Sequence, residues 1–205
     1  MTAQALLKAE PRFTWDEYQS WPEEERWELI DGVAYAMSPA PSTKHQTVAG
    51  NIFGKLLQGL AGKPCRPFFA PTDVRLSDQD VVQPDILVVC KPGQITPTHI
   101  EGAPQVVVEV LSPATSTRDQ REKKALYERT GVMEYVLVDP LEHYAIRFLN
   151  GTDGNDVGFD KGTVFGPEEM LLFATLDGLE VPLWEVFEVP GPDANKAPVN
   201  GPPRG

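Results

Sequence analysis

Apolar residues recur along the chain with two different periods, and each period predicts a different kind of element. One set recurs at helical spacing: Val48, Ile52, Leu56 and Leu60. This set predicts an amphipathic helix over 43–61. Thr43 and Gln46 have the spacing of a capping box at its start, and Gly62 follows its end. A second capping box predicts a short helix that begins at Thr14.

Strands are predicted where apolar residues form short runs or alternate with polar ones. The strand-like segments are 67–76, 82–90, 105–111, 134–140 and 144–149. Asp31-Gly32 between two alternating stretches predicts a hairpin. A polar turn and a helix over 117–130 separate the third strand from the fourth, which favours a parallel pair with a crossover helix. The order of elements therefore predicts an α/β fold with a central mixed β-sheet flanked by helices.

Composition narrows the class of protein without identifying it. The 205 residues suffice for one domain, and no apolar run is long enough to span a membrane. The first residues lack the basic start and apolar region of a signal peptide, so we expect a cytoplasmic protein. Cys65 and Cys90 have no metal-type spacing, and we expect two reduced thiols. A formal net charge of −12 argues against a general nucleic-acid binder, although carboxylates that bind a metal would contribute to it.

Glu109 is the residue that the hydrophobic pattern does not explain. It lies inside the run QVVVEVL, where an unpaired carboxylate would be costly to bury. Asp85 begins the neighbouring predicted strand, so the two carboxylates can converge if the strands pair. Two carboxylates in an apolar sheet are suitable ligands for Mg²⁺, and the carbonyl of Val110 could supply a further oxygen. Asp85 could also be an ordinary residue at a strand entry after proline.

The helix that follows carries a stripe of polar residues. Asp119, Lys123 and Tyr127 recur every four residues and so share one side of the helix. A lysine on that side, facing the sheet, could reach the carboxylates or an attacking water. Lys124 points about 100° away and is expected to face solvent. Without this stripe, Lys123 would be interpreted as a solvated helix lysine.

Five stretches in this order resemble the Uma-two family of restriction-endonuclease-like proteins, within the PD-(D/E)XK nuclease superfamily. They are WELIDG (27–32), MSPAPSTKHQ (37–46), VQPDILVV (82–89), VVEVLSPAT (107–115) and DQREKKALYERTGVMEYVLVDP (119–140). The resemblance covers roughly residues 12–187. It implies a restriction-endonuclease-like domain over 1–188, and the Pro- and Gly-rich residues 189–205 are expected to form a disordered tail. In one departure, Leu111 occupies the motif's lysine position, and Lys123 matches a basic residue moved to the next helix.

The resemblance implies a Mg²⁺-dependent endodeoxyribonuclease, with Mn²⁺ as an alternative metal. Asp85, Glu109 and the Val110 carbonyl would hold the metal, and Lys123 would orient or deprotonate water or stabilise developing charge. Glu28 would complete the acidic cluster. The residues expected to line the site are His45, Gln83 and Tyr127. DNA would be the partner, and a homodimer would place two sites on the two strands of a duplex.

Several of these residues also have ordinary structural interpretations. Glu28 could pair across the hairpin with Tyr35 or Arg26, and His45 could be an unremarkable early-helix residue. For the whole protein, the alternative is a catalytically inactive nucleic-acid-binding or regulatory module that retains the nuclease fold. A nuclease requires Asp85, Glu109 and a basic group around one metal, with a positive rim, whereas a binding module could lack either.

Overall fold

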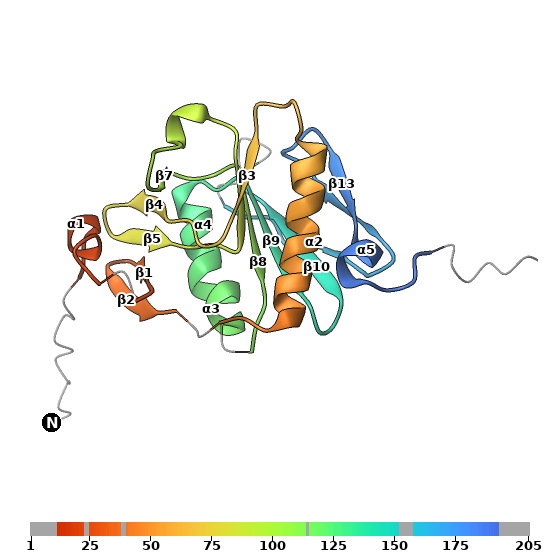
Figure 1. The fold of residues 1–205 in the computed structure, drawn as a ribbon, viewed down its shortest axis with the longest axis horizontal. Coiled ribbons are helices and arrows are strands. Elements are labelled where there is room, and N and C mark those ends of the chain that lie inside the picture. Colours follow the sequence, from red (N-terminus) through yellow and green to blue (C-terminus); the bar gives the residue numbers. More distant parts are fainter. Residues whose placement is uncertain (1–11, 23–24, 38–39, 114, 152–157, 193–205) are drawn as a thin grey trace, which may run out of the picture.

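A six-stranded mixed sheet forms the centre of the molecule (Figure 1). The computed structural model describes residues 12–22, 25–37, 40–113, 115–151 and 158–192. In spatial order the strands are β11 (Thr163–Phe165), β10 (Tyr144–Leu149), β9 (Glu134–Asp139), β8 (Val106–Val110), β6 (Ile86–Val89) and β3 (Arg66–Phe69). Strands β8 and β9 are parallel, and the other neighbours are antiparallel. The predicted α/β class, the mixed sheet and the parallel pair are confirmed.

Helices cover both faces of this sheet (Figure 1). On one face α2 (Thr43–Gly59) and α5 (Leu183–Phe187) pack against the even-numbered residues of β8. On the other face a helix made of three consecutive parts packs against the odd-numbered residues. Its parts are α3 (Ser116–Arg118), the π-helical turn η2 (Asp119–Lys123) and α4 (Lys124–Thr130). Because side chains alternate across a strand, both faces of β8 are buried, which explains its near-continuous run of valines.

A second, five-stranded sheet lies beside the first. Its strands, in spatial order, are β2 (Val33–Ala36), β1 (Trp27–Ile30), β5 (Asp80–Val82), β4 (Val74–Ser77) and β7 (Ile100–Glu101). The remaining elements are α1 (Trp15–Tyr18), the 3₁₀ turn η1 (Pro92–Gln94) and the hairpin of β12 (Met170–Phe173) with β13 (Leu179–Pro182). Strands β1 and β2 form the predicted hairpin, and Asp31 and Gly32 both have the positive φ values that a tight primed turn requires.

Two predicted strands are each divided between the two sheets. Segment 67–76 becomes β3 and β4, and segment 82–90 becomes β5 and β6. Pro71 and Pro84 stand at the two breaks, and proline cannot donate a hydrogen bond to a strand partner. Asp85 therefore lies just before β6, at the junction of the sheets. The start of α2 also differs from the prediction: the N-cap is Ser42, whose hydroxyl accepts a hydrogen bond from the His45 N–H.

The prediction of two reduced cysteines is wrong, because Cys65 and Cys90 form a disulfide. Strands β3 and β6 pair with Arg66 opposite Val89, so the residues just beyond this pair face one another, with a Cα–Cα distance of 3.9 Å. Their separation of 25 residues gave no sign of this register. Disulfides are rare in cytoplasmic proteins, so the cytoplasmic location stays a prediction.

The predicted boundary between domain and tail lies close to the end of the described residues. In the described residues, Val189 packs against the core beneath α5, and residues 193–205 lie outside the described part. The boundary between domain 1–188 and tail 189–205 therefore stays a prediction. Within the described ranges, no helix is both long and apolar enough to cross a membrane.

Candidate metal centre and active site

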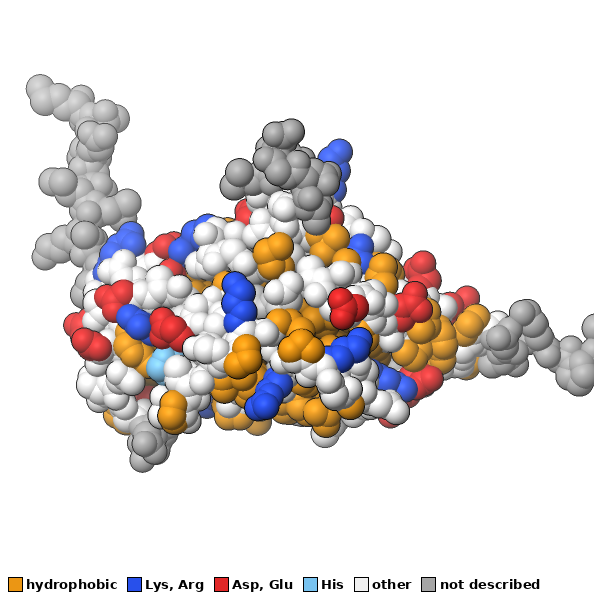
Figure 2. Space-filling view, turned by 90° about the horizontal axis from the view of Figure 1, so that it is seen from above, with side chains coloured by type: hydrophobic (Ala, Val, Ile, Leu, Met, Phe, Trp, Pro, Cys, Tyr) orange, Lys and Arg blue, Asp and Glu red, His pale blue; other side chains and the backbone are white. Residues whose placement is uncertain are grey.

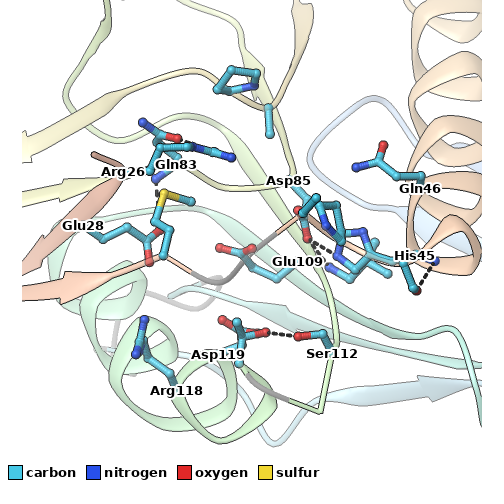
Figure 3. Close-up of a pocket in the computed structure, with 18 of the residues that line it drawn as sticks. Arg26, Glu28, His45, Gln46, Gln83, Asp85, Glu109, Ser112, Arg118 and Asp119 are labelled. Carbon is cyan, nitrogen blue, oxygen red and sulfur yellow. Dashed lines mark hydrogen bonds and ion pairs between the residues drawn. The ribbon is translucent and has the colours of Figure 1, made fainter. Parts of the chain in front are cut away.

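A cavity of about 470 Å³ opens where the two sheets meet, and four carboxylates line it. They come from four different segments: Glu28 from β1, Asp85 from the residues before β6, Glu109 from β8, and Asp119 from η2. In Figure 3 these carboxylates point toward a common space. Sheet pairing explains the central two. Ile86 lies opposite Val108, so Asp85 and Glu109 are the next pair along antiparallel strands.

Asp85 is held in place by the backbone and by a histidine. The Val110 N–H donates to Asp85 Oδ2 at 2.8 Å, and His45 Nε2 lies 3.2 Å from the same oxygen. Although burial opposes the charged imidazolium, the Asp85 carboxylate and the Val110 backbone raise the pKa of His45 above its ordinary value. No hydrogen bond from a described residue reaches Asp85 Oδ1, so this oxygen is available to a ligand.

Lys123 is buried among three of the carboxylates. Its Nζ lies 2.8 Å from Glu28 Oε1, 2.9 Å from Glu109 Oε1 and 3.8 Å from Asp119 Oδ1. The π-helical turn over Asp119–Lys123 is wider than an α-helical turn, a feature that recurs at functional sites. Burial opposes the charge of Lys123, but its carboxylate neighbours outweigh burial and raise its pKa. The ammonium is therefore retained at neutral pH.

Two more predicted residues fix the carboxylates from behind. The Tyr127 hydroxyl donates to Glu109 Oε1 at 2.8 Å, and the Gln83 N–H donates to Glu28 Oε1 at 3.1 Å. The Gln83 side chain spans from Arg26, which donates to its Oε1, to Asp73, which accepts from its Nε2. Glu28 lies opposite Tyr35 in the hairpin, yet its recorded partners are Lys123 and Gln83. Its interpretation as a simple hairpin pair is therefore not supported.

In the interior of the cavity, carboxylates outnumber cations. Four carboxylates face one buried ammonium and one histidine, and two further cations, Arg26 and Arg118, also line the cavity. Burial raises the pKa of Glu109 to about 8; Lys123 opposes this rise, and the carboxylates of Asp119, Asp85 and Glu28 add to it. Burial likewise raises the pKa of Asp119, whose Oδ1 is buried without a hydrogen-bond partner among the described residues. A further cation would relieve this imbalance.

The donor chemistry fits a hard divalent cation. Carboxylate oxygens are the ligands that Mg²⁺ prefers, and Mg²⁺ is commonly held by one or two carboxylates while it keeps several waters. Asp85 and Glu109 provide such a pair. Among the described residues, no group of three or more histidine, cysteine, aspartate or glutamate side chains is placed to hold a metal ion. A cation at this pair would therefore need further ligands, such as water, beyond these side chains.

The structure brings all the predicted site residues to one cavity or to its immediate support. Those that line the cavity are Glu28, His45, Gln83, Asp85, Glu109, Val110 and Lys123, and Tyr127 supports Glu109 from the core. Asp119 also lines the cavity, although the sequence did not identify it as a site residue. Its place on the stripe with Lys123 was the available signal, since i and i+4 residues lie on one side of a helix.

These features define an α/β protein with a buried acidic site at the junction of two sheets. A family model described as "Putative restriction endonuclease" (Uma2) matches residues 15–182, and the chain belongs to this family. An uncharacterized protein of Synechocystis sp. is 30% identical over 132 residues, which cover 62% of this chain and 69% of that protein.

A solved structure shares the fold. It is described as a putative nuclease belonging to DUF820 from Anabaena variabilis, and it superposes with a TM-score of 0.70 at 20% sequence identity. The match covers 86% of this chain and 98% of that one. The predicted restriction-endonuclease-like family and fold are confirmed.

Proposed function

We propose that this protein is a Mg²⁺-dependent endonuclease that hydrolyses phosphodiester bonds in DNA, with Mn²⁺ able to replace Mg²⁺. The observation that carries the proposal is the convergence of Asp85 and Glu109 with Lys123 in one cavity whose interior holds more carboxyl groups than basic groups. Family membership supports the same reaction class. Fold similarity alone would not, because one fold hosts many activities.

In this proposal Asp85 and Glu109 hold the cation. A bound Mg²⁺ would polarise a phosphate and lower the pKa of water. His45 and the Val110 N–H keep the Asp85 carboxylate oriented, and Tyr127 does the same for Glu109. Glu28 reaches the same space from the second sheet and keeps Lys123 in position. Val110 remains a candidate ligand through its carbonyl oxygen.

Lys123 is the proposed basic group of the reaction. Its raised pKa keeps it protonated at neutral pH, so the role that fits best is electrostatic: it stabilises charge that develops on the phosphate oxygens. Proton abstraction from water would need the neutral amine, which the surrounding carboxylates disfavour. Of the roles open to Lys123 from the sequence, charge stabilisation is therefore favoured over general-base catalysis.

The rim of the cavity bears on the alternative of an inactive binding module. Arg26 and Arg118 line the opening, so the acidic cavity has cations at its edge despite the acidic chain. A phosphate backbone could approach these guanidinium groups. We also propose a homodimer, in which two symmetry-related sites cut the two strands of a duplex, and sedimentation analysis would test it.

The test is nicking of supercoiled plasmid in Mg²⁺, Mn²⁺ or EDTA. We expect cutting with either metal, none in EDTA, and a loss of about a hundredfold or more in Asp85→Asn, Glu109→Gln and Lys123→Ala. Lys63→Ala is the control, since Lys63 is exposed beyond the end of α2. Absence of metal-dependent cutting on plasmid and single-stranded DNA would favour the binding module. Activity retained in Glu109→Gln would exclude Glu109 as a ligand.

A further inference from the structure

A second cavity, of about 500 Å³, lies between the β1–β2 hairpin and the helix of η2 and α4. We call it the arginine groove. Its charged and aromatic lining consists of Arg12, Asp31, Tyr35, Arg121, Glu122 and Arg129. None of these residues belongs to the carboxylate site, and the proposed function leaves the groove unexplained.

The groove adjoins the carboxylate cavity where Arg118 stacks on Tyr35. Arg118 lines the carboxylate cavity, and its guanidinium lies 4.6 Å from the centre of the Tyr35 ring. Tyr35 in turn lines the arginine groove. Figure 3 shows Arg118 on the helix beside Glu28 and Asp119. Stacking fixes the plane of a guanidinium while leaving its N–H groups free for an anion.

The arginines in and beside the groove differ in whether a carboxylate already balances their charge. Arg129 contacts the carboxylates of both Asp80 and Asp31, so its charge is balanced. Arg118 and Arg121 have no carboxylate partner among the described residues. Arg121 is exposed, and Arg118 is half-buried against Tyr35. Arg121 in the groove and Arg118 at its border with the carboxylate cavity are therefore available to an external anion, and Arg12, also in the groove, donates to the backbone carbonyl of Asp31.

Arg118 and Arg121 lie close together beside one aromatic ring. Arg118 stacks on the Tyr35 ring, and Arg121, at the π-helical turn that follows, lines the groove together with Tyr35. A polyanion such as a nucleic-acid backbone offers a phosphate to each arginine at the same time, which an isolated ion cannot do. Figure 2 shows positive, negative and apolar side chains interspersed over the face that it views.

We propose that the arginine groove, together with the adjoining Arg118, binds the DNA backbone to one side of the scissile phosphate, with Arg118 and Arg121 each contacting a phosphate. This inference rests on the proposed function, because it assumes that the carboxylate cavity receives the phosphate that is cut. Glu122, next to Arg121 in the groove, opposes binding through its charge. Removing this charge should therefore strengthen the interaction with DNA.

The test measures binding of a fluorescently labelled 30-base-pair duplex by anisotropy, as a function of salt. The full chain carries Asp85→Asn to prevent cutting, and Mg²⁺ is present. We expect Arg118→Ala and Arg121→Ala each to weaken binding about fivefold to tenfold at low salt. Each should also reduce the slope of log K against log salt by about 0.9, the value for one lost phosphate contact. Glu122→Gln should tighten binding, and Lys63→Ala should leave the affinity and the slope unchanged.

Two results would contradict DNA binding by the groove. One is that Lys63→Ala weakens DNA binding as much as Arg121→Ala does. The other is that neither arginine variant changes DNA binding. Plasmid nicking by the unmodified protein separates this inference from the proposed function. If the protein cuts plasmid but the arginine variants bind DNA normally, the nuclease proposal stands and the groove proposal fails. If the arginine variants lose DNA binding but the unmodified protein does not cut, the groove proposal stands and the nuclease proposal fails.

Discussion

Glu109 and Glu134 are two buried glutamates on adjacent parallel strands, yet their surroundings are opposite in character. Glu109 is 4% exposed on β8, and Glu134 is fully buried at the start of β9. Their side chains point to opposite faces of the sheet, because Glu109 alternates with the valines that face α2, whereas Glu134 is in phase with Val136 and Val138, which face α2. Burial alone therefore does not distinguish a functional carboxylate from a structural one.

Their partners make the distinction. Glu134 accepts hydrogen bonds from the N–H groups of Ala174 and Thr175 and from the Thr175 hydroxyl, and these tie the turn after β12 to the sheet. Its hydrogen-bond donors belong to one turn, Arg147 Nε lies 4.0 Å from its Oε1, and no second carboxylate is among its partners in the described residues. Glu109 instead shares Lys123 with Glu28 and Asp119 beside a cavity. Several carboxylates gathered beside a cavity, rather than a single buried carboxylate, indicate a ligand site.

The largest effect should distinguish two adjacent lysines. Lys123→Ala leaves the carboxylates without their buried cation, and such a loss typically costs about 3–5 kcal/mol of stability. Lys124 lies over the Phe148 ring, and Lys124→Ala should cost less than about 1 kcal/mol. Urea denaturation without metal measures both variants, and nicking should be lost only in Lys123→Ala. An equal loss of unfolding free energy in the two variants would contradict the role of Lys123 as the buried partner of the carboxylates.

An intermediate effect is expected for Glu134→Gln. The new amide NH₂ would face backbone donors, and an unsatisfied buried group costs about 1–3 kcal/mol. Denaturation should register this loss, while the specific activity of the folded protein should stay within about twofold of the parent. A selective loss of activity in Glu134→Gln would contradict the contrast between the two glutamates.

A third effect, which is spread over several pH units, is the pH dependence of stability in the metal-free protein. Burial raises the pKa of Glu109 from 4.5 to about 8, so between these values the folded state binds more protons than the unfolded state. Stability should therefore fall as pH rises through this window. His45, whose pKa is also raised, contributes stability that is present below its ordinary 6.5 and lost at higher pH. Denaturation at a series of pH values should give a shallower slope in Glu109→Gln; an unchanged slope would contradict the raised pKa of Glu109.

Much of the fold was predictable because local patterns and tertiary packing agree. The helix from 43, the Asp31-Gly32 turn and the parallel pair all carry local signals that the structure obeys. The assignment of segments to two sheets was not predictable, since it depends on long-range pairing at the breaks near Pro71 and Pro84. The Cys65–Cys90 disulfide depends on the register of β3 with β6, which no local pattern reports.

The candidate site shows the same division. Asp85 and Glu109 were predictable as neighbours because strand alternation gives each a face. The distance from Glu28 to Lys123 was not, because it depends on how the second sheet docks against the helix. By the same reasoning from sequence, Glu134 in its apolar run resembles Glu109. Only the packed turn at Ala174 and Thr175 reveals its separate role.

The central claim is that the carboxylate cavity holds a divalent cation through Asp85 and Glu109. Titration calorimetry with Mn²⁺ at pH 8, on the unmodified protein, Glu109→Gln and Glu134→Gln, tests it without relying on catalysis. The account predicts saturable binding that is lost in Glu109→Gln and retained in Glu134→Gln. Binding that persists unchanged in Glu109→Gln, or no binding to the unmodified protein, would contradict it.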